Sequence, residues 1–210
     1  MAIVLYAEPH WVSPYVFACF VALREKNLEF ESRVLDASKN ETRTDDYLAS
    51  TITGRIPTLS HDGFAIAESS AIVEYLDDAF PETPVLPRAI RDRARARQLM
   101  SWMRSDDTAL IRAERPAHTL FYRSQSKPLT AECVRAKDKL VQVFDRLVGK
   151  KDGIFDAWSI VDAELSFLLR RLVASGDEVP VHVRAWVDRA WQRPSVRAYG
   201  ELARPAIEAS

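Results

Sequence analysis

Three short segments near the N-terminus carry groups suited to holding one small ligand. They are Ser13-Pro14-Tyr15, Arg55-Ile56-Pro57-Thr58-Leu59 and Glu68-Ser69-Ser70-Ala71-Ile72. Alone, each has an ordinary structural interpretation: the start of a helix, a turn or edge position, and a helix cap. Together, a hydroxyl at a helix start, a proline-bounded backbone and an acidic-serine pair could each make a different contact to the same molecule.

The elements that must position these segments can be predicted from hydrophobic patterning. Residues 3–6 form a short apolar run typical of a buried strand, residues 14–25 an apolar helix opened by a proline, and residues 28–34 a second strand. A strand, a helix and a strand over this length predict a βαβ unit with parallel strands and a right-handed connection.

A hairpin and a third helix follow. Two short apolar runs, residues 58–60 and 64–67, flank His61-Asp62-Gly63, and Asp-Gly favours a tight turn. Residues 69–80 then repeat apolar side chains at a helical period. The polar stretch of residues 36–53 leaves its structure open, with a helix near residues 45–49 as one option.

Pro81, Pro84 and Pro87 end the third helix and mark a domain boundary. We therefore predict a first domain at residues 1–80, a linker at 81–90 and an all-helical domain at 91–210. The helical domain shows four amphipathic stretches, at residues 91–112, 130–147, 160–173 and 181–192.

The charge balance of the chain argues against nucleic acid and membranes as partners. The 210 residues hold 29 Lys and Arg against 30 Asp and Glu, a net charge of -1 that offers no attraction to nucleic acid or to an anionic membrane. The run of arginines over residues 88–97 is interpreted as a solvated helix face.

Cys19 and Cys133 lack the spacing of a disulfide framework or zinc site, and no metal site is expected from the scattered histidines. Without a leader or a long apolar stretch, we expect a soluble, cytoplasmic protein.

In the order of its motifs, the chain resembles a cytosolic-type glutathione S-transferase of the bacterial kind over nearly its whole length. The resemblance implies an α/β thioredoxin-like N-terminal domain that binds glutathione, followed by an all-α C-terminal domain that supplies the second-substrate pocket. Ser13 matches the active-site serine of that family, Pro57 its cis-proline, and Glu68 and Ser69 its acidic-serine pair.

The chemistry of a thiol explains why a hydroxyl is needed at position 13. A thiol with a pKa of about 8.5 is only about 3% ionised at neutral pH, and lowering its pKa by about two units makes it mostly nucleophilic. A hydrogen bond from Ser13 together with the positive end of a helix is about the right size. Tyr6 is the alternative, because other branches of the family use a tyrosine near the end of the first strand. Position 13 carries no sulfur, which disfavours exchange through a protein disulfide.

The resemblance also implies how other residues contact glutathione, and it implies that no metal takes part. The backbone of Ile56, turned outward by Pro57, pairs with the cysteinyl residue as a one-residue strand addition. Ser69 receives the γ-glutamyl carboxylate and Glu68 pairs with the ammonium. Arg55 is a candidate to hold the glycyl carboxylate, and Lys39 and Arg43 are equal alternatives.

In the helical half, Trp102 or Arg104 is expected to help form the second-substrate pocket, with a core or dimer contact as the alternative. Residues 159–162 read as a capping box that opens an apolar helix.

The resemblance implies a homodimeric glutathione transferase of the detoxification type. It would direct the thiolate at a small electrophile or, as a peroxidase, at a peroxide. The alternatives are a catalytically silent transferase-fold interaction protein, and a glutathione-dependent isomerase or dehalogenase.

Overall fold

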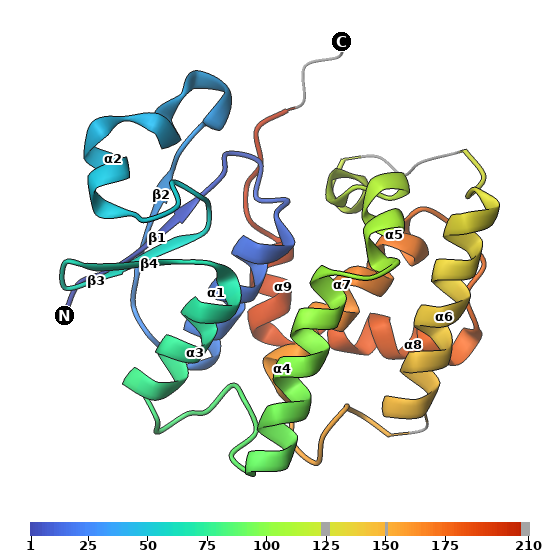
Figure 1. Cartoon of the computed structure of the whole chain (residues 1–210). Coiled ribbons are helices and arrows are strands. Elements are labelled where there is room, and N and C mark those ends of the chain that lie inside the picture. Colours follow the sequence, from blue (N-terminus) through green and yellow to red (C-terminus); the bar gives the residue numbers. More distant parts are fainter. Residues whose placement is uncertain (123–126, 150, 207–210) are drawn as a thin grey trace. The chain divides into compact units, whose positions relative to one another are not determined.

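A computed structural model describes residues 1–122, 127–149 and 151–206 of the chain (Figure 1). The chain forms two compact units, one of Met1–Val85 with the segment that begins at Ala198, and one of Leu86–Arg197. The first unit therefore contains both ends of the described chain. The predicted helical domain ran to residue 210, and the return of the C-terminal segment to the first unit departs from that boundary.

The first unit contains a mixed four-stranded sheet in the order β2-β1-β3-β4. Its strands are β1 (Ile3–Ala7), β2 (Glu31–Val34), β3 (Thr58–His61) and β4 (Phe64–Ala67). β1 pairs parallel to β2, with Leu5 opposite Ser32, and antiparallel to β3, with Leu5 opposite Leu59. The second strand is shorter than the predicted 28–34, and all four of its residues are exposed.

The predicted hairpin is confirmed. β3 and β4 pair antiparallel up to His61 opposite Phe64, leaving Asp62 and Gly63 as a two-residue loop. Both loop residues have positive φ, 47° and 88°, as the favoured hairpin turn requires.

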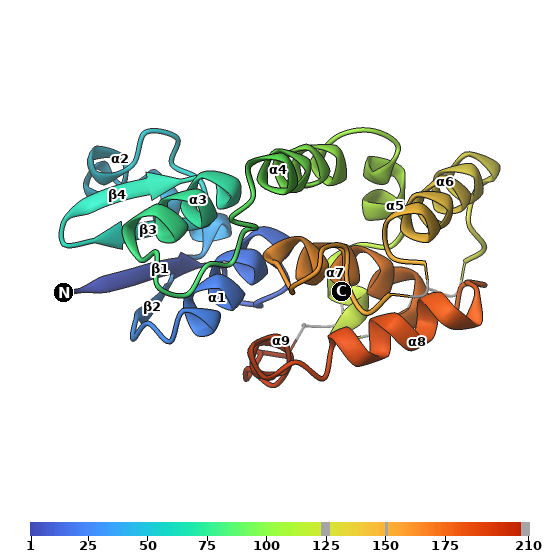
Figure 2. The ribbon, with the colours of Figure 1, turned by 90° about the horizontal axis from the view of Figure 1, so that it is seen from below.

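Helices α1 (Pro14–Glu25) and α3 (Ser69–Ala79) pack against each other beside the sheet (Figure 2). Leu5 and Leu59 are fully buried in this core. Side chains alternate across a strand, so Tyr6 lies on the other face, against Tyr47 of α2 (Asp45–Ser50). The polar stretch before α2 contains two 3-10 turns, Ala37–Lys39 and Glu41–Arg43.

A buried ion pair joins the C-terminal ends of α1 and α3. The Lys26 ammonium lies 3.0 Å from the Asp77 carboxylate, and each side chain is only 1% exposed. Lys26 also donates to the carbonyls of Phe80 and Thr83, at 2.9 and 2.7 Å, while Asp77 accepts from the Val85 amide at 2.7 Å. Burial without partners would be costly, and here both charges are hydrogen-bonded.

The second unit is helical over its described residues. Its helices are α4 (Ile90–Arg104), α5 (Thr108–Glu114), the 3-10 turn Ala117–Leu120, α6 (Ala131–Leu147), α7 (Ile160–Ala174), α8 (Val181–Ala190) and the start of α9 (Pro194–Gly200). The predicted amphipathic stretch of residues 91–112 is divided in two. The helix is interrupted at Asp106, whose φ of 54° is incompatible with a continuous right-handed helix.

The capping box at the start of α7 is confirmed. The Asp162 carboxylate accepts the Ser159 amide at 2.9 Å and the Ile154 amide at 2.8 Å. Burial raises the pKa of Asp162, and these hydrogen bonds oppose that shift. Within the described part of the chain, every helix is too short or too polar to cross a lipid bilayer.

Candidate functional site

Ser13 caps the N-terminus of α1. Its Oγ accepts hydrogen bonds from the amides of Tyr15 at 3.2 Å and Val16 at 3.3 Å. Pro14 has no N–H, and the Phe17 amide is bonded to the Ser13 carbonyl at 2.9 Å. The first-turn amides are therefore occupied, and the Ser13 hydroxyl hydrogen is the donor that this helix end can offer to a ligand.

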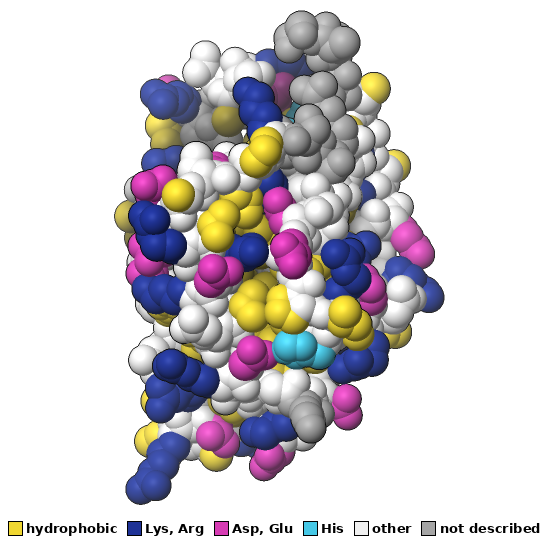
Figure 3. Space-filling model, turned by 90° about the vertical axis from the view of Figure 1, so that its right-hand side faces the viewer, with side chains coloured by type: hydrophobic (Ala, Val, Ile, Leu, Met, Phe, Trp, Pro, Cys, Tyr) yellow, Lys and Arg dark blue, Asp and Glu magenta, His cyan; other side chains and the backbone are white. Residues whose placement is uncertain are grey.

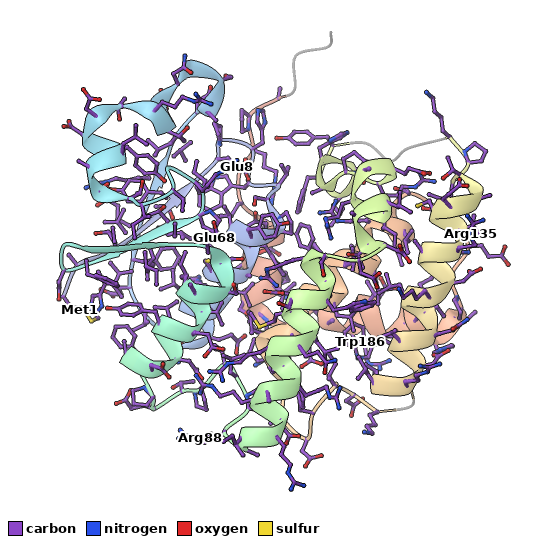
Figure 4. All side chains as sticks on the ribbon, in the orientation of Figure 1. Met1, Glu8, Glu68, Arg88, Arg135 and Trp186 are labelled. Carbon is purple, nitrogen blue, oxygen red and sulfur yellow. The ribbon has the colours of Figure 1, made fainter. Side chains whose placement is uncertain are left out.

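The loop between β1 and Ser13 is held by Glu8. Its carboxylate accepts from the amides of His10 and Val12, both at 2.7 Å, and of Ser13 at 2.9 Å. Sequence reasoning missed Glu8, although an acidic residue just after a strand and just before a helix start was a usable signal. Figure 4 labels Glu8 here and Glu68 at the start of α3.

Tyr6, the alternative thiolate partner, contacts residues of the sheet and of α2. Its ring meets that of Tyr47 edge to face, with centroids 5.4 Å apart, and it is paired across the strands with Arg33. The Tyr6 hydroxyl contributes to raising the pKa of Arg33, after the larger contribution of Glu31. Both contacts are structural.

The segment Arg55–Thr58 forms a turn that leaves one residue's backbone available. The Ile56–Pro57 peptide is cis, the isomer that the resemblance implies. Neither the N–H nor the C=O of Ile56 is hydrogen-bonded to any residue that the structure describes. An extended peptide could therefore pair with both groups.

Tyr47 supports this turn from α2. Its hydroxyl donates to the Arg55 carbonyl at 2.8 Å and lies 3.1 Å from Thr58 Oγ1, which donates to the same carbonyl at 2.8 Å. Burial raises the pKa of Tyr47, so its hydroxyl remains a donor. Tyr47 is a second supporting residue that the sequence motifs did not reveal.

The N-terminus of α3 is capped differently from that of α1. Glu68 occupies the cap position with a φ of 71° and makes no side-chain capping bond. Glu68 is exposed, whereas Ser69 is only 4% exposed. The first amides of an α-helix have no acceptor within the helix, so this end suits an anion.

The three candidate cations differ in their surroundings. The Lys39 ammonium lies 3.5 Å from the Asp36 carboxylate. Arg43 and Arg55 are exposed, and neither side chain is bonded to a described residue. The structure thus leaves Arg43 and Arg55 as the better candidates.

In the helical unit, Trp102 and Arg104 have local partners. The Trp102 indole N–H donates to Asp106. The Arg104 guanidinium makes two bonds of 2.8 Å to the Glu164 carboxylate and a third, of 2.7 Å, to the Met100 carbonyl. Arg104 therefore links α4 to α7, whereas the Trp102 bond reaches only Asp106, in the segment that follows α4.

Other chemistry receives little support from the described residues. Cys19 and Cys133 are buried, and burial raises the pKa of Cys133 to about 11, so it stays a protonated thiol at neutral pH. No group of three or more His, Cys, Asp or Glu side chains in the described ranges could hold a metal ion.

The helical unit has a groove between α6 and the start of α8, lined by Lys137, Asp138, Val141, Gln142 and residues 178–181. The face on that side of Figure 1 mixes both signs of charge with hydrophobic patches (Figure 3). The Lys137 ammonium donates to the Glu178 carbonyl at 3.1 Å. None of the predicted site residues lies in this groove.

Comparison with known proteins places these features in context. The model of the glutathione S-transferase N-terminal domain matches residues 12–79, and that of the C-terminal domain matches residues 89–204. A crystal structure of a glutathione transferase homologue from Burkholderia gl. BGR1, with bound glutathione, is similar at 38% identity. It has a TM-score of 0.77, over 95% of this chain and 96% of that one.

Two curated relatives are similar over different lengths. Maleylacetoacetate isomerase of Dictyostelium discoideum is 36% identical over 49% of this chain, which spans about half (47%) of that protein's length. Glutathione transferase GST 23 of Zea mays is 28% identical over 85% of this chain and 81% of the maize protein.

Proposed function

Because the chain belongs to the glutathione S-transferase family, we propose that it binds glutathione in its first unit and ionises the thiol for attack on a small electrophile or a peroxide. The observation that carries this proposal is the Ser13 hydroxyl. The Ser13 oxygen accepts hydrogen bonds from two helix amides, and the hydroxyl hydrogen remains available to donate to a ligand. Two amides bonded to the oxygen polarise the O–H bond and make it a better donor.

The energetics suit this role. A hydrogen bond to a charged group contributes about 1.5–3 kcal/mol, and one pKa unit corresponds to about 1.4 kcal/mol. The hydroxyl and the α1 dipole together could lower the thiol pKa by about two units. Catalysis is then mainly positioning and stabilisation of the thiolate.

The rest of the tripeptide has matching partners. The Ile56 N–H and C=O pair with the cysteinyl backbone, Ser69 and the first amides of α3 receive the γ-glutamyl carboxylate, and Glu68 pairs with the ammonium. Arg43 or Arg55 holds the glycyl carboxylate. The Ile56 assignment is supported by a backbone N–H and C=O without a described partner, and the Glu68 assignment by a side chain that makes no capping bond.

The remaining parts of the proposal concern the second substrate and the assembly. We assign Trp102 to the second-substrate pocket, with Arg104 beside it held by Glu164. We also propose that the protein works as a cytoplasmic homodimer in detoxification.

Calorimetry and ultraviolet titration test this function. Calorimetry should detect glutathione binding at or below millimolar ligand, where a catalytically silent interaction protein of this fold would bind none. The absorbance of the bound thiolate, followed against pH, should titrate with a midpoint about two units below that of free glutathione. A midpoint equal to that of the free thiol would contradict the proposal.

A second candidate is a glutathione-dependent isomerase, favoured by the 36% identity to maleylacetoacetate isomerase. In such a reaction the thiolate adds to the substrate and leaves again, so glutathione acts as a cofactor and is not consumed. Product analysis after many turnovers distinguishes the two. A transferase consumes one glutathione per product, and an isomerase leaves its concentration unchanged.

A further inference from the structure

The C-terminal end of the first unit is tied to the loop that carries Ser13. The Arg204 guanidinium donates to the Trp11 carbonyl twice, from Nε at 3.3 Å and from Nη2 at 3.1 Å. It also donates to three carbonyls at the end of α9, those of Tyr199 at 2.8 Å, Gly200 at 2.9 Å and Leu202 at 2.8 Å. One side chain thus bridges the end of α9 and the loop that precedes Ser13.

Trp11 needs such support because of its backbone. Its φ of 49° lies in the left-handed region, which a bulky residue rarely adopts. Its amide donates to the Glu8 carbonyl at 3.3 Å, and its ring packs against those of Phe20 and Tyr199. Strained conformations of this kind persist where the surroundings over-determine them, and they cluster at functional sites.

Tyr199 reaches Ser13 itself. Its hydroxyl donates to the Ser13 carbonyl at 3.2 Å, and its ring is fully buried against Phe17 and Phe20. Burial raises the pKa of Tyr199 well above its ordinary value, and the negative charge of Glu8 adds to this effect. The phenol is therefore a permanent hydrogen-bond donor.

We propose that Arg204 and Tyr199 are positioning residues, which hold the Ser13 hydroxyl where it can donate to the glutathione thiolate. Glu8 binds the loop amides, and the C-terminal pair binds the loop carbonyls of Trp11 and Ser13. This inference rests on the proposed function, and it adds residues that lie outside the glutathione-binding motifs. A hydrogen bond to a thiolate depends steeply on geometry, so a loosened loop weakens it even when Ser13 is intact.

The test compares Arg204→Met and Tyr199→Phe with Ser13→Ala. Arg204→Met keeps an unbranched apolar stem and loses all of the donors, and Tyr199→Phe keeps the ring and loses only the hydroxyl. We expect the pH midpoint of bound glutathione to rise by about 0.5–1 unit in each, less than in Ser13→Ala. The value of kcat should fall about two- to threefold at neutral pH, in line with the smaller thiolate fraction, with KM for glutathione nearly unchanged. Arg204→Lys, which restores one donor group, should recover part of both effects.

Arg146→Ala is the matched control, because Arg146 is an exposed arginine near the end of α6 with no bonded partner among the described residues. It should leave the midpoint unchanged. An unchanged midpoint in both Arg204→Met and Tyr199→Phe, with a raised midpoint in Ser13→Ala, overturns the positioning role and leaves the proposed function standing. If Ser13→Ala also leaves the midpoint unchanged, the thiolate role of Ser13 fails, and the positioning role fails with it.

Unfolding must be separated from positioning. Thermal denaturation of each variant identifies any that fails to fold, and should Arg204→Met do so, the nearly isosteric Tyr199→Phe decides the question alone. Glutathione binding and kcat that fall in proportion, at an unchanged midpoint, would show a purely structural role and overturn the proposal.

Discussion

The N-termini of α1 and α3 are both helix starts, but only that of α1 is capped by a side chain. At α1 the first-turn amides are occupied by Ser13, and the preceding loop is bound to Glu8 and Arg204. At α3 the cap residue, Glu68, makes no capping bond. One helix end thus presents a single oriented hydroxyl, and the other has no capping bond from its N-cap side chain.

This difference between the helix ends matches the different needs of two groups of glutathione, its thiol and its γ-glutamyl carboxylate. A thiol must be ionised, which calls for one well-placed donor in a rigid setting. A carboxylate is already ionised at neutral pH and gains from several amides and the helix dipole. We therefore expect changes at α1 to alter the chemistry of bound glutathione, and changes at α3 to alter its affinity.

The largest effect should come from the ion pair that joins the other ends of these two helices. Lys26→Met leaves the Asp77 carboxylate buried without its cation, and we expect the free energy of unfolding to fall by about 3–5 kcal/mol. Denaturant unfolding measures it. The double variant Lys26→Met/Asp77→Leu should recover much of the loss, and a double variant no more stable than the single would contradict this account.

Next in size is the loss of the Ser13 hydroxyl. Ser13→Ala should raise the pKa of bound glutathione by about 1–2 units, because a hydrogen bond to a charged group contributes about 1.5–3 kcal/mol. The activity profile should shift to higher pH by the same amount, since the thiolate is the reactive form. Loss of the cap should lower the free energy of unfolding by only about 1 kcal/mol. Ser13→Thr keeps the hydroxyl and should keep the pKa within about 0.5 unit.

At α3 we expect affinity and stability to move in opposite directions. Glu68→Gly removes the carboxylate, so the Kd for glutathione should rise about tenfold, while the pH midpoint of the bound thiol stays unchanged. Glycine also relieves the positive φ of position 68, and the free energy of unfolding should stay the same or rise by up to about 1 kcal/mol.

Glu68→Gln is the control, because it removes the charge and retains the strained backbone. Calorimetry and denaturant unfolding separate the two effects. If Glu68→Gly moved the pH midpoint as far as Ser13→Ala does, the division of labour between the two helix ends would be wrong.

The smallest effect is expected at Tyr47, which supports the Ile56 turn. Tyr47→Phe keeps the ring against Tyr6 and removes the hydroxyl from the Arg55 carbonyl. We expect a loss of about 1 kcal/mol in the free energy of unfolding and a rise of a few-fold in the Kd for glutathione. Tyr6→Phe, measured beside it, should leave the thiol pKa unchanged; a rise there would return Tyr6 to the mechanism.

Local signals made the fold largely predictable. Asp62-Gly63 between two apolar runs specified the hairpin, and Ser159 with Asp162 specified the start of α7, because both patterns act over a few residues. The motifs at Ser13, Pro57 and Ser69 were readable for the same reason. The break at Asp106 was missed because a single left-handed residue leaves the helical period around it intact.

The supporting contacts of the site could not be read in this way. Tyr47 and Arg204 bind backbone carbonyls, and a carbonyl leaves no signature in the sequence. Arg204 and Trp11 are also 193 residues apart, so no spacing rule connects them. Glu8 is the exception, because its acidic type and its place just before Ser13 were a usable signal, although its three acceptor contacts depend on a loop shape that only the folded chain shows.

The return of the chain to its first unit bears on how the protein is made. Trp11 and Phe20 emerge from the ribosome early, whereas Tyr199, the ring that covers them, is translated after the whole helical unit. The N-terminal unit can form its sheet during synthesis, yet it can close its aromatic core only after Tyr199 has been made. Until then the rings of Trp11 and Phe20 lack the cover that the Tyr199 ring provides.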